Sequence, residues 1–162
     1  MESSKLFHYS NFKLTYGVAS YVNVVDLDKF RRCLPNVRGF SHELMIEQGR
    51  HYGLPEEYRT CPYCEGCIED HIHFLLICPL YKELRSRYLS NIHENSSHID
   101  MFYRLMSSNS ICVRYVAMFI YYASIERKHY LDIYMYLLCC NIDLVICFST
   151  TLHTAHCVFV CI

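Results

Sequence analysis

The sequence has almost no net charge, with a formal value of −1 and a pI near 6.8. Non-specific affinity for nucleic acids comes largely from basic residues that neutralise phosphates, so this balance argues against a strongly electrostatic nucleic-acid binder. The sequence also lacks an apolar signal core near its N-terminus, where Lys5, His8 and Lys13 are scattered. The eleven cysteines are therefore expected to be reduced, in an intracellular protein of the nucleus or cytoplasm.

Cysteine and histidine are gathered in one central stretch of the chain. Cys61 and Cys64 form a Cys-x2-Cys pair, His73 follows after eight further residues and Cys78 after four more. Three thiolates and one imidazole are the ligand mixture that selects a closed tetrahedral zinc site over a hard-cation or catalytic site. The sequence therefore predicts that these four residues hold Zn²⁺.

Each half of this predicted site has a local structural reason. Pro62 suits the fixed φ angle of a tight turn, which would let the first two cysteines place their sulfurs about 2.3 Å from one ion. The apolar residues after His73 favour a short helical turn, and Pro79 interrupts it. Cys78 would then swing back towards His73.

Other residues compete with this ligand set. Cys67 makes a second Cys-x2-Cys pair with Cys64, and His71 lies two residues before His73, so either could replace a named ligand. The alternative without metal is that the cysteines are buried and reduced and act as small apolar side chains. An iron–sulfur centre is less favoured, because the fourth cysteine lies far outside the short ferredoxin spacing.

A catalytic zinc site ranks last among these alternatives. It would need an open coordination position and a nearby general acid or base, whereas three cysteines and one histidine fill a tetrahedron. Glu69 and Asp70 are better explained as hydrogen-bond partners of the neighbouring histidines. We therefore expect no catalytic residues and no small-molecule substrate.

A wider set of residues around the predicted site resembles a known family. The set consists of Arg31, Leu34, Arg38 and the runs 42–50, 59–64, 69–74 and 78–85. Taken together, these residues resemble the zinc-binding region at the C-terminal end of reverse transcriptases of non-LTR retrotransposons, over about residues 12–127 of this chain. The resemblance implies a zinc-binding module that helps to hold RNA or DNA for a reverse transcriptase, here one supplied in trans.

The chain departs from this family at three points. His71 stands where similar sequences usually carry an acidic residue, and Pro35 falls inside a segment that is helical in the family. The chain also has no Tyr-x-Asp-Asp polymerase signature and no endonuclease domain. We therefore expect a module that is not an enzyme.

The local charge pattern offers one surface for nucleic acid. Basic residues outnumber acidic ones by two between positions 29 and 59. Arg31, Arg38, Arg50 and Arg59 are the candidates for phosphate contacts, and binding through them should be weak and sensitive to salt. The alternative is a solvated face with ordinary salt bridges.

The expected fold is mainly α, with short helices around a small Cys-Cys-His-Cys zinc knuckle and an apolar C-terminal tail. Residues 12–25 are rich in β-branched and aromatic side chains, but their apolar spacing and the family resemblance favour a helix. Ser41 is predicted to cap a helix that Gly49 ends, and a long helix is expected from Ile111 towards Lys128. The predicted divisions are an N-terminal helical segment 1–25, a zinc-binding domain 26–90, a helical extension 91–129 and a cysteine-rich tail 130–162.

The tail differs in composition from the rest of the chain, since it has no Lys or Arg and five cysteines among Leu, Ile, Val and Phe. Residues 131–162 are long enough to span a bilayer, which needs about 20 apolar residues, but Asn141 and Asp143 make insertion marginal. No helical or strand period organises the tail, so an unselected read-through of the reading frame is favoured over a membrane anchor.

These observations favour one function and leave two alternatives. The favoured function is a non-catalytic zinc-binding module that assists RNA or DNA binding. The second is a small membrane-associated protein, anchored through residues 131–162, whose zinc knuckle binds other proteins. The third is a decayed open reading frame without present function.

Overall fold

The structure is a computed structural model, and it describes residues 7–13, 17–64, 66–90, 96–107 and 112–149. Over these residues the regular structure is helical, apart from an isolated antiparallel bridge between Thr60 and Ile68. The predicted mainly helical fold is therefore confirmed. The chain divides into two units, Met1–Arg127 and Lys128–Ile162, and the hydrophobic core lies in the first.

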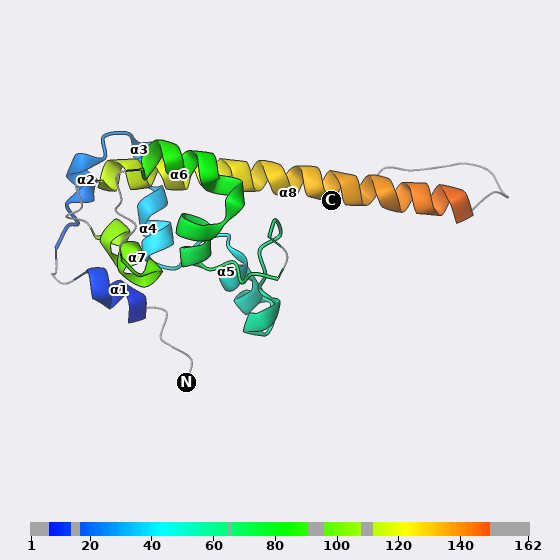
Figure 1. Ribbon diagram of the computed structural model, residues 1–162, viewed down its shortest axis with the longest axis horizontal. Coiled ribbons are helices and arrows are strands. Elements are labelled where there is room, and N and C mark those ends of the chain that lie inside the picture. The colour runs from blue at the N-terminus through cyan, green and yellow to red at the C-terminus, as the bar shows by residue number, and fades with distance from the viewer. Residues whose placement is uncertain (1–6, 14–16, 65, 91–95, 108–111, 150–162) are drawn as a thin grey trace. The chain divides into compact units, whose positions relative to one another are not determined.

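Most of the helices are short, and the chain passes from one to the next through turns (Figure 1). They are α1 (Phe7–Phe12), α2 (Tyr21–Val24), α3 (Asp28–Arg31), α4 (Cys33–Arg38), α5 (Met45–His51), the 3-10 turn η1 (Glu56–Tyr58), the π-helical turn η2 (His73–Ile77), the 3-10 turn η3 (Pro79–Tyr81), α6 (Lys82–Tyr88), α7 (His98–Met106) and α8 (Val113–Ser149). Helices this short are not stable alone in water, so packing must stabilise them.

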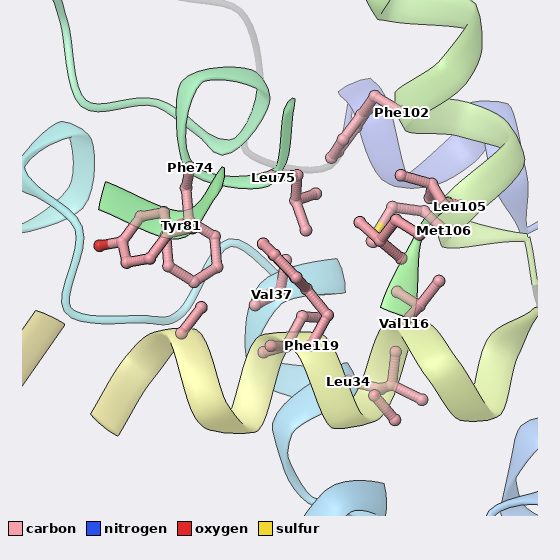
Figure 2. Close-up of a cluster of buried hydrophobic side chains, with 14 of the residues drawn as sticks. Leu34, Val37, Phe74, Leu75, Tyr81, Phe102, Leu105, Met106, Val116 and Phe119 are labelled. Carbon is pink, nitrogen blue, oxygen red and sulfur yellow. The ribbon is translucent and has the colours of Figure 1, made fainter. Parts of the chain in front are cut away.

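The core forms where side chains of α4, η2, α7 and the first part of α8 meet (Figure 2). Leu34, Leu75 and Phe119 have no exposed surface. Phe119 of α8 lies 6.1 Å from the ring of Phe74 and 6.4 Å from that of Tyr81, both edge-on. A fully buried side chain of this size contributes about 1.5–3 kcal/mol. The turn η2, which carries His73, is thus anchored by the core.

The segment predicted as one helix, 12–25, is not one continuous helix, because its described residues 13 and 17–20 are not helical. α1 ends at Phe12 and α2 begins only at Tyr21. Gly17 lies between them with a φ angle of +116°, which no residue of a right-handed helix adopts. Residues 14–16, which belong to the same prediction, lie outside the described residues.

Helix α5 differs from the prediction at both ends. It begins at Met45, not directly after Ser41, and Gly49 is buried within it. The N–H of Met45 donates to Glu69 Oε2 over 2.7 Å, so a carboxylate distant in sequence supplies the hydrogen bond that a local serine was expected to give.

Helix α8 continues well past the predicted end near Lys128. The tail, for which no periodic structure was expected, is helical as far as Ser149, and residues 150–162 lie outside the described residues. The backbone hydrogen bonds of a helix require no apolar stripe, so the missing period did not exclude this conformation. No helix in the described part of the chain combines the length and the apolar character that crossing a membrane requires.

Candidate metal centre

The structure brings the four predicted ligands together. Ligand atoms of Cys61, Cys64, His73 and Cys78 all lie within 4.8 Å of one another. The sulfur of Cys78 is 3.9 Å from that of Cys61 and 3.6 Å from that of Cys64, and none of these cysteines forms a disulfide. Two sulfurs bound at about 2.3 Å to one tetrahedral ion would be about 3.8 Å apart. The sulfur positions therefore fit a tetrahedral metal ion.

A closed loop positions the first two cysteines. The N–H of Glu69 donates to the carbonyl of Arg59 over 2.9 Å, and the N–H of Cys61 donates to the carbonyl of Cys67 over 2.7 Å. Gly66 at the far end of the loop has a φ angle of +87°, a conformation that favours glycine. These backbone contacts close the loop that carries the Cys-x2-Cys turn.

The π-helical turn η2 positions the other two ligands. At its start, Oδ1 of Asp70 accepts from the N–H of His73 over 2.7 Å. At its end the N–H of Cys78 donates to the carbonyl of His73 over 2.8 Å, a bond across five residues. In an α-helix residues five apart point about 140° away from each other, whereas the wider turn brings this pair to one side. The turn ends before Pro79, as predicted, and Pro79 begins the next helical turn, η3.

The histidine of the cluster has an unsatisfied nitrogen. His73 is 4 % exposed, and its buried Nε2 has no hydrogen-bond partner. A buried polar atom left without a partner costs about 1–3 kcal/mol, so such atoms mark a missing ligand or strain. The unsatisfied nitrogen beside three sulfurs fits a bound metal ion.

The three thiols of the cluster have very different affinities for protons. The pKa of Cys61 is lowered, mainly by the hydrogen bond between its sulfur and that of Cys78, while burial opposes the shift. The same hydrogen bond, together with burial, raises the pKa of Cys78. Burial also raises the pKa of Cys64. The surroundings thus lower the pKa of one thiol and raise those of the other two, and a cation among them would favour the thiolate form of all three.

The two competing residues lie outside this cluster. Cys67 is exposed. The ring of His71 lies 4.2 Å from that of His42 and 4.1 Å from that of Phe40, and its Nε2 faces Nε2 of His42. Of the possible ligand sets, the structure therefore assembles Cys61, Cys64, His73 and Cys78.

The expectation that Glu69 and Asp70 bond to histidine side chains is wrong. Both oxygens of Glu69 accept from Arg127 of α8, over 2.7 and 2.8 Å, and both side chains are buried. Asp70 bonds to the backbone of His73, not to its ring. Glu69 therefore ties the ligand-bearing loop to α8.

The four arginines predicted to contact nucleic acid all make contacts within the chain. Arg31 donates to the carbonyl of Val22 and pairs with Asp28, and Arg50 pairs with Glu47. Arg38 is buried, and its Cζ lies 5.1 Å from the centre of the Tyr21 ring. Arg59 donates to the carbonyls of Leu54 and Ile46. Nothing in these contacts tests whether the arginines bind nucleic acid, so that role stays a prediction.

Two polar side chains beside the cluster were missed. Arg85 of α6 donates from one terminal nitrogen to the carbonyl of Cys78 over 2.5 Å, and its other terminal nitrogen, Nη1, is buried without a hydrogen-bond partner. The hydroxyl of Tyr81 is also buried without one. Their i, i+4 spacing on one helical face was the signal available in the sequence.

Comparisons with known proteins give no family for this chain. No family model matches the sequence, and no curated protein or solved structure matches it either.

Proposed function

We propose that the chain is a non-catalytic zinc-binding module, in which Cys61, Cys64, His73 and Cys78 are the ligands. The observation that carries this proposal is the clustering of their four ligand atoms within 4.8 Å. Soft thiolates with one imidazole favour zinc over calcium, magnesium or manganese. Four protein ligands also leave no coordination position for a reacting water, which supports a structural site.

Zinc at this site would link the closed loop to the π-helical turn η2. Cys61 and Cys64 lie in the closed loop, while His73 and Cys78 flank η2. Residues Phe74 and Leu75 follow His73 directly and are buried in the core. Apparent zinc free energies are about 10 kcal/mol or more in small fingers, comparable to the 5–15 kcal/mol stability of a whole domain. Metal binding and folding of this region should therefore be coupled.

A role in RNA or DNA binding is the second part of the proposal, and the resemblance to reverse-transcriptase zinc regions motivates it. One structural observation supports it, since Tyr52 and Tyr58 are 78 % and 66 % exposed and lie close in sequence to Arg50 and Arg59. Exposed tyrosines can stack on unpaired bases, and nearby arginines can contact phosphates. Replacing Arg50 and Arg59 by glutamine should weaken binding to single-stranded RNA and reduce its salt dependence. Binding with a salt slope near zero would contradict this role.

The zinc assignment is tested on the full chain by metal analysis after purification without added chelator. We expect about one zinc per chain, and loss of that zinc when Cys64→Ser and Cys78→Ser are combined. Cys67→Ser is the matched control, because this cysteine lies in the same loop but outside the cluster. Unchanged zinc content in the double variant would overturn the assignment.

A further inference from the structure

The sulfurs of the candidate metal centre are close enough to react with one another. Sγ of Cys78 lies 3.6 Å from that of Cys64 and 3.9 Å from that of Cys61, and all three cysteines are free thiols. The two sulfurs of a disulfide are about 2.05 Å apart, so Cys64 and Cys78 would have to approach each other by about 1.5 Å to form one. The cluster that can hold a metal ion is therefore also a cluster that oxidation can cross-link.

The three thiols differ in how far solvent reaches them. Cys64 is half-buried, whereas Cys61 is 4 % exposed and Cys78 has no exposed surface. Oxidation of a thiolate by a dissolved hydroperoxide requires access to its sulfur. Cys64 is therefore the member of the cluster that the oxidant reaches first, and the sulfur of Cys78 is already in contact with it.

The effect of a disulfide on the fold depends on the pair that forms it. Cys61 and Cys64 both lie in the closed loop, so a bond between them would join the two ends of one turn and would not connect the loop to η2. Cys78 follows η2 directly, so a bond from Cys64 to Cys78 would connect the same two segments that zinc would connect. It would also close a ring over residues 64–78, which restricts the unfolded chain.

We propose that a hydroperoxide converts this metal centre into a Cys64–Cys78 disulfide, which releases the metal and replaces it as the link between the closed loop and η2. The thiolate of Cys64 attacks a peroxide oxygen, so that an S–O bond forms, the O–O bond breaks and hydroxide leaves. The thiolate of Cys78 then attacks the sulfur of the resulting sulfenic acid, so that the S–S bond forms, the S–O bond breaks and a second hydroxide leaves. The two sulfurs together lose two electrons to the peroxide, and the two hydroxides take up two protons from water.

This inference rests on the proposed zinc function and adds a regulation of the same site. Thiolates bind metal and disulfide sulfurs do not, so only Cys61 and His73 would remain as ligands, which is too few for a closed tetrahedral site. Zinc therefore leaves, while the new covalent bond keeps the loop next to η2. A dithiol reductant reverses the cross-link by thiol–disulfide exchange, after which the site can bind zinc again.

The test treats the zinc-loaded full chain with hydrogen peroxide and follows zinc release with a chromophoric chelator. The remaining thiols are then blocked with iodoacetamide, and the chain is digested with an endopeptidase that cleaves after glutamate. Cleavage separates residues 58–65, which contain Cys61 and Cys64, from residues 66–69 and 70–83, which contain Cys67 and Cys78 respectively. A disulfide to Cys78 therefore appears as two linked peptides, and fragmentation of this pair by mass spectrometry distinguishes Cys64 from Cys61.

We expect one Cys64–Cys78 disulfide for each zinc released. The matched control is Cys67→Ser, which removes an exposed thiol of the same loop outside the cluster and should give the same disulfide and the same zinc release. The oxidised, zinc-free chain should unfold at a higher temperature than the reduced, zinc-free chain, because only the former has a link between the loop and η2. Dithiothreitol together with added zinc should restore the zinc content.

Three results would overturn the inference and leave the zinc assignment intact. They are a disulfide within residues 58–65, a disulfide between Cys64 and Cys67, and a Cys64–Cys78 disulfide whose chain unfolds at the same temperature as the reduced, zinc-free chain. A chain that binds no zinc before oxidation would instead overturn the proposed function and the release of metal with it. The failure of the inference and the failure of the proposed function are therefore distinguished by zinc analysis before the peroxide is added.

Discussion

Glu69 connects three parts of the first unit, namely its own loop, α5 and α8. Its carboxylate accepts two hydrogen bonds from Arg127 and one from the N–H of Met45, and its carbonyl accepts from the N–H of Ile46 over 3.1 Å. The side chains of Glu69 and Arg127 are only 2 % and 8 % exposed. Removing one partner of such a pair leaves a buried charge uncompensated, which costs far more than the loss of an exposed pair.

Glu69→Gln should therefore lower the free energy of unfolding by about 3–5 kcal/mol, because Arg127 would keep its charge in a buried place. Urea unfolding of the zinc-loaded protein measures this change. Arg32→Gln is the control, since Arg32 pairs with Asp28 over 2.5 Å but is 79 % exposed, and its loss should cost less than about 1 kcal/mol. Equal effects of the two variants would contradict the importance of the buried pair.

The clustering of the four candidate ligands could be predicted because its determinants are local. Cys61 to Cys78 lie within one short stretch, and their spacing alone limits how four donors can meet. The partners of Glu69 and the placement of Arg85 could not be predicted in the same way. Arg127 is far from Glu69 in sequence, and a charged residue on a short helix gives no sign of whether its guanidinium is buried.

At the scale of the helices, prediction succeeded where the apolar spacing and the cap are local. The spacing of Phe102, Leu105 and Met106 is typical of one helical face, and all three are buried in α7. Its N-terminus is capped by Ser97, whose Oγ accepts from the N–H of Asp100 over 3.2 Å. The start of α5 was misplaced because its cap comes from Glu69, which only tertiary structure brings near.

Helix α5 also contains a position where a methyl group does not fit. A Cβ atom at Gly49 would lie 2.6 Å from Cγ of Arg59, whose guanidinium is held by the carbonyls of Leu54 and Ile46. Gly49→Ala should therefore lower the free energy of unfolding by about 1–3 kcal/mol, although alanine favours a helix by about 1 kcal/mol over glycine. Thermal unfolding checks this, with the exposed Ser86→Ala of α6 as the control. A stabilised Gly49→Ala variant would show that Arg59 can move aside.

The π-helical turn η2 should respond most to metal removal. Its residues Phe74 and Leu75 belong to the core, while its two ends carry the ligands His73 and Cys78. Adding a strong zinc chelator should speed amide hydrogen exchange in η2 and in the loop that contains Cys61 and Cys64. If the chelator leaves amide hydrogen exchange in these segments unchanged, their folding does not depend on metal binding.

At the scale of the whole molecule, the two units differ in what stabilises them. The first unit holds the core and the candidate metal centre. The part of α8 that belongs to the second unit carries exposed apolar side chains, namely Ile133, Tyr134, Met135, Tyr136, Leu137 and Leu138. Exposed apolar surface of this kind promotes aggregation.

A chain that ends at Arg127 should therefore keep the zinc content and the thermal unfolding of the full chain, because no candidate ligand or core residue is removed. Its solubility should increase, as measured by light scattering at rising protein concentration. Arg127 must be retained, since it pairs with Glu69. A truncated chain that loses zinc or unfolds at a much lower temperature would show that the second unit stabilises the first.

The wide turn of η2 also bears on how the sequence could change. The turn holds one more residue between its bonded N–H and C=O groups than an α-helical turn does, so it has the form of a helix that has accepted a single-residue insertion. Removing one residue between His73 and Cys78 would leave the pair four apart, and residues four apart share one face of an ordinary α-helix. Chains of either length could present the same two donors to a metal ion. The spacing of four residues between them is therefore one of two spacings at which a helical turn can present both side chains on one side.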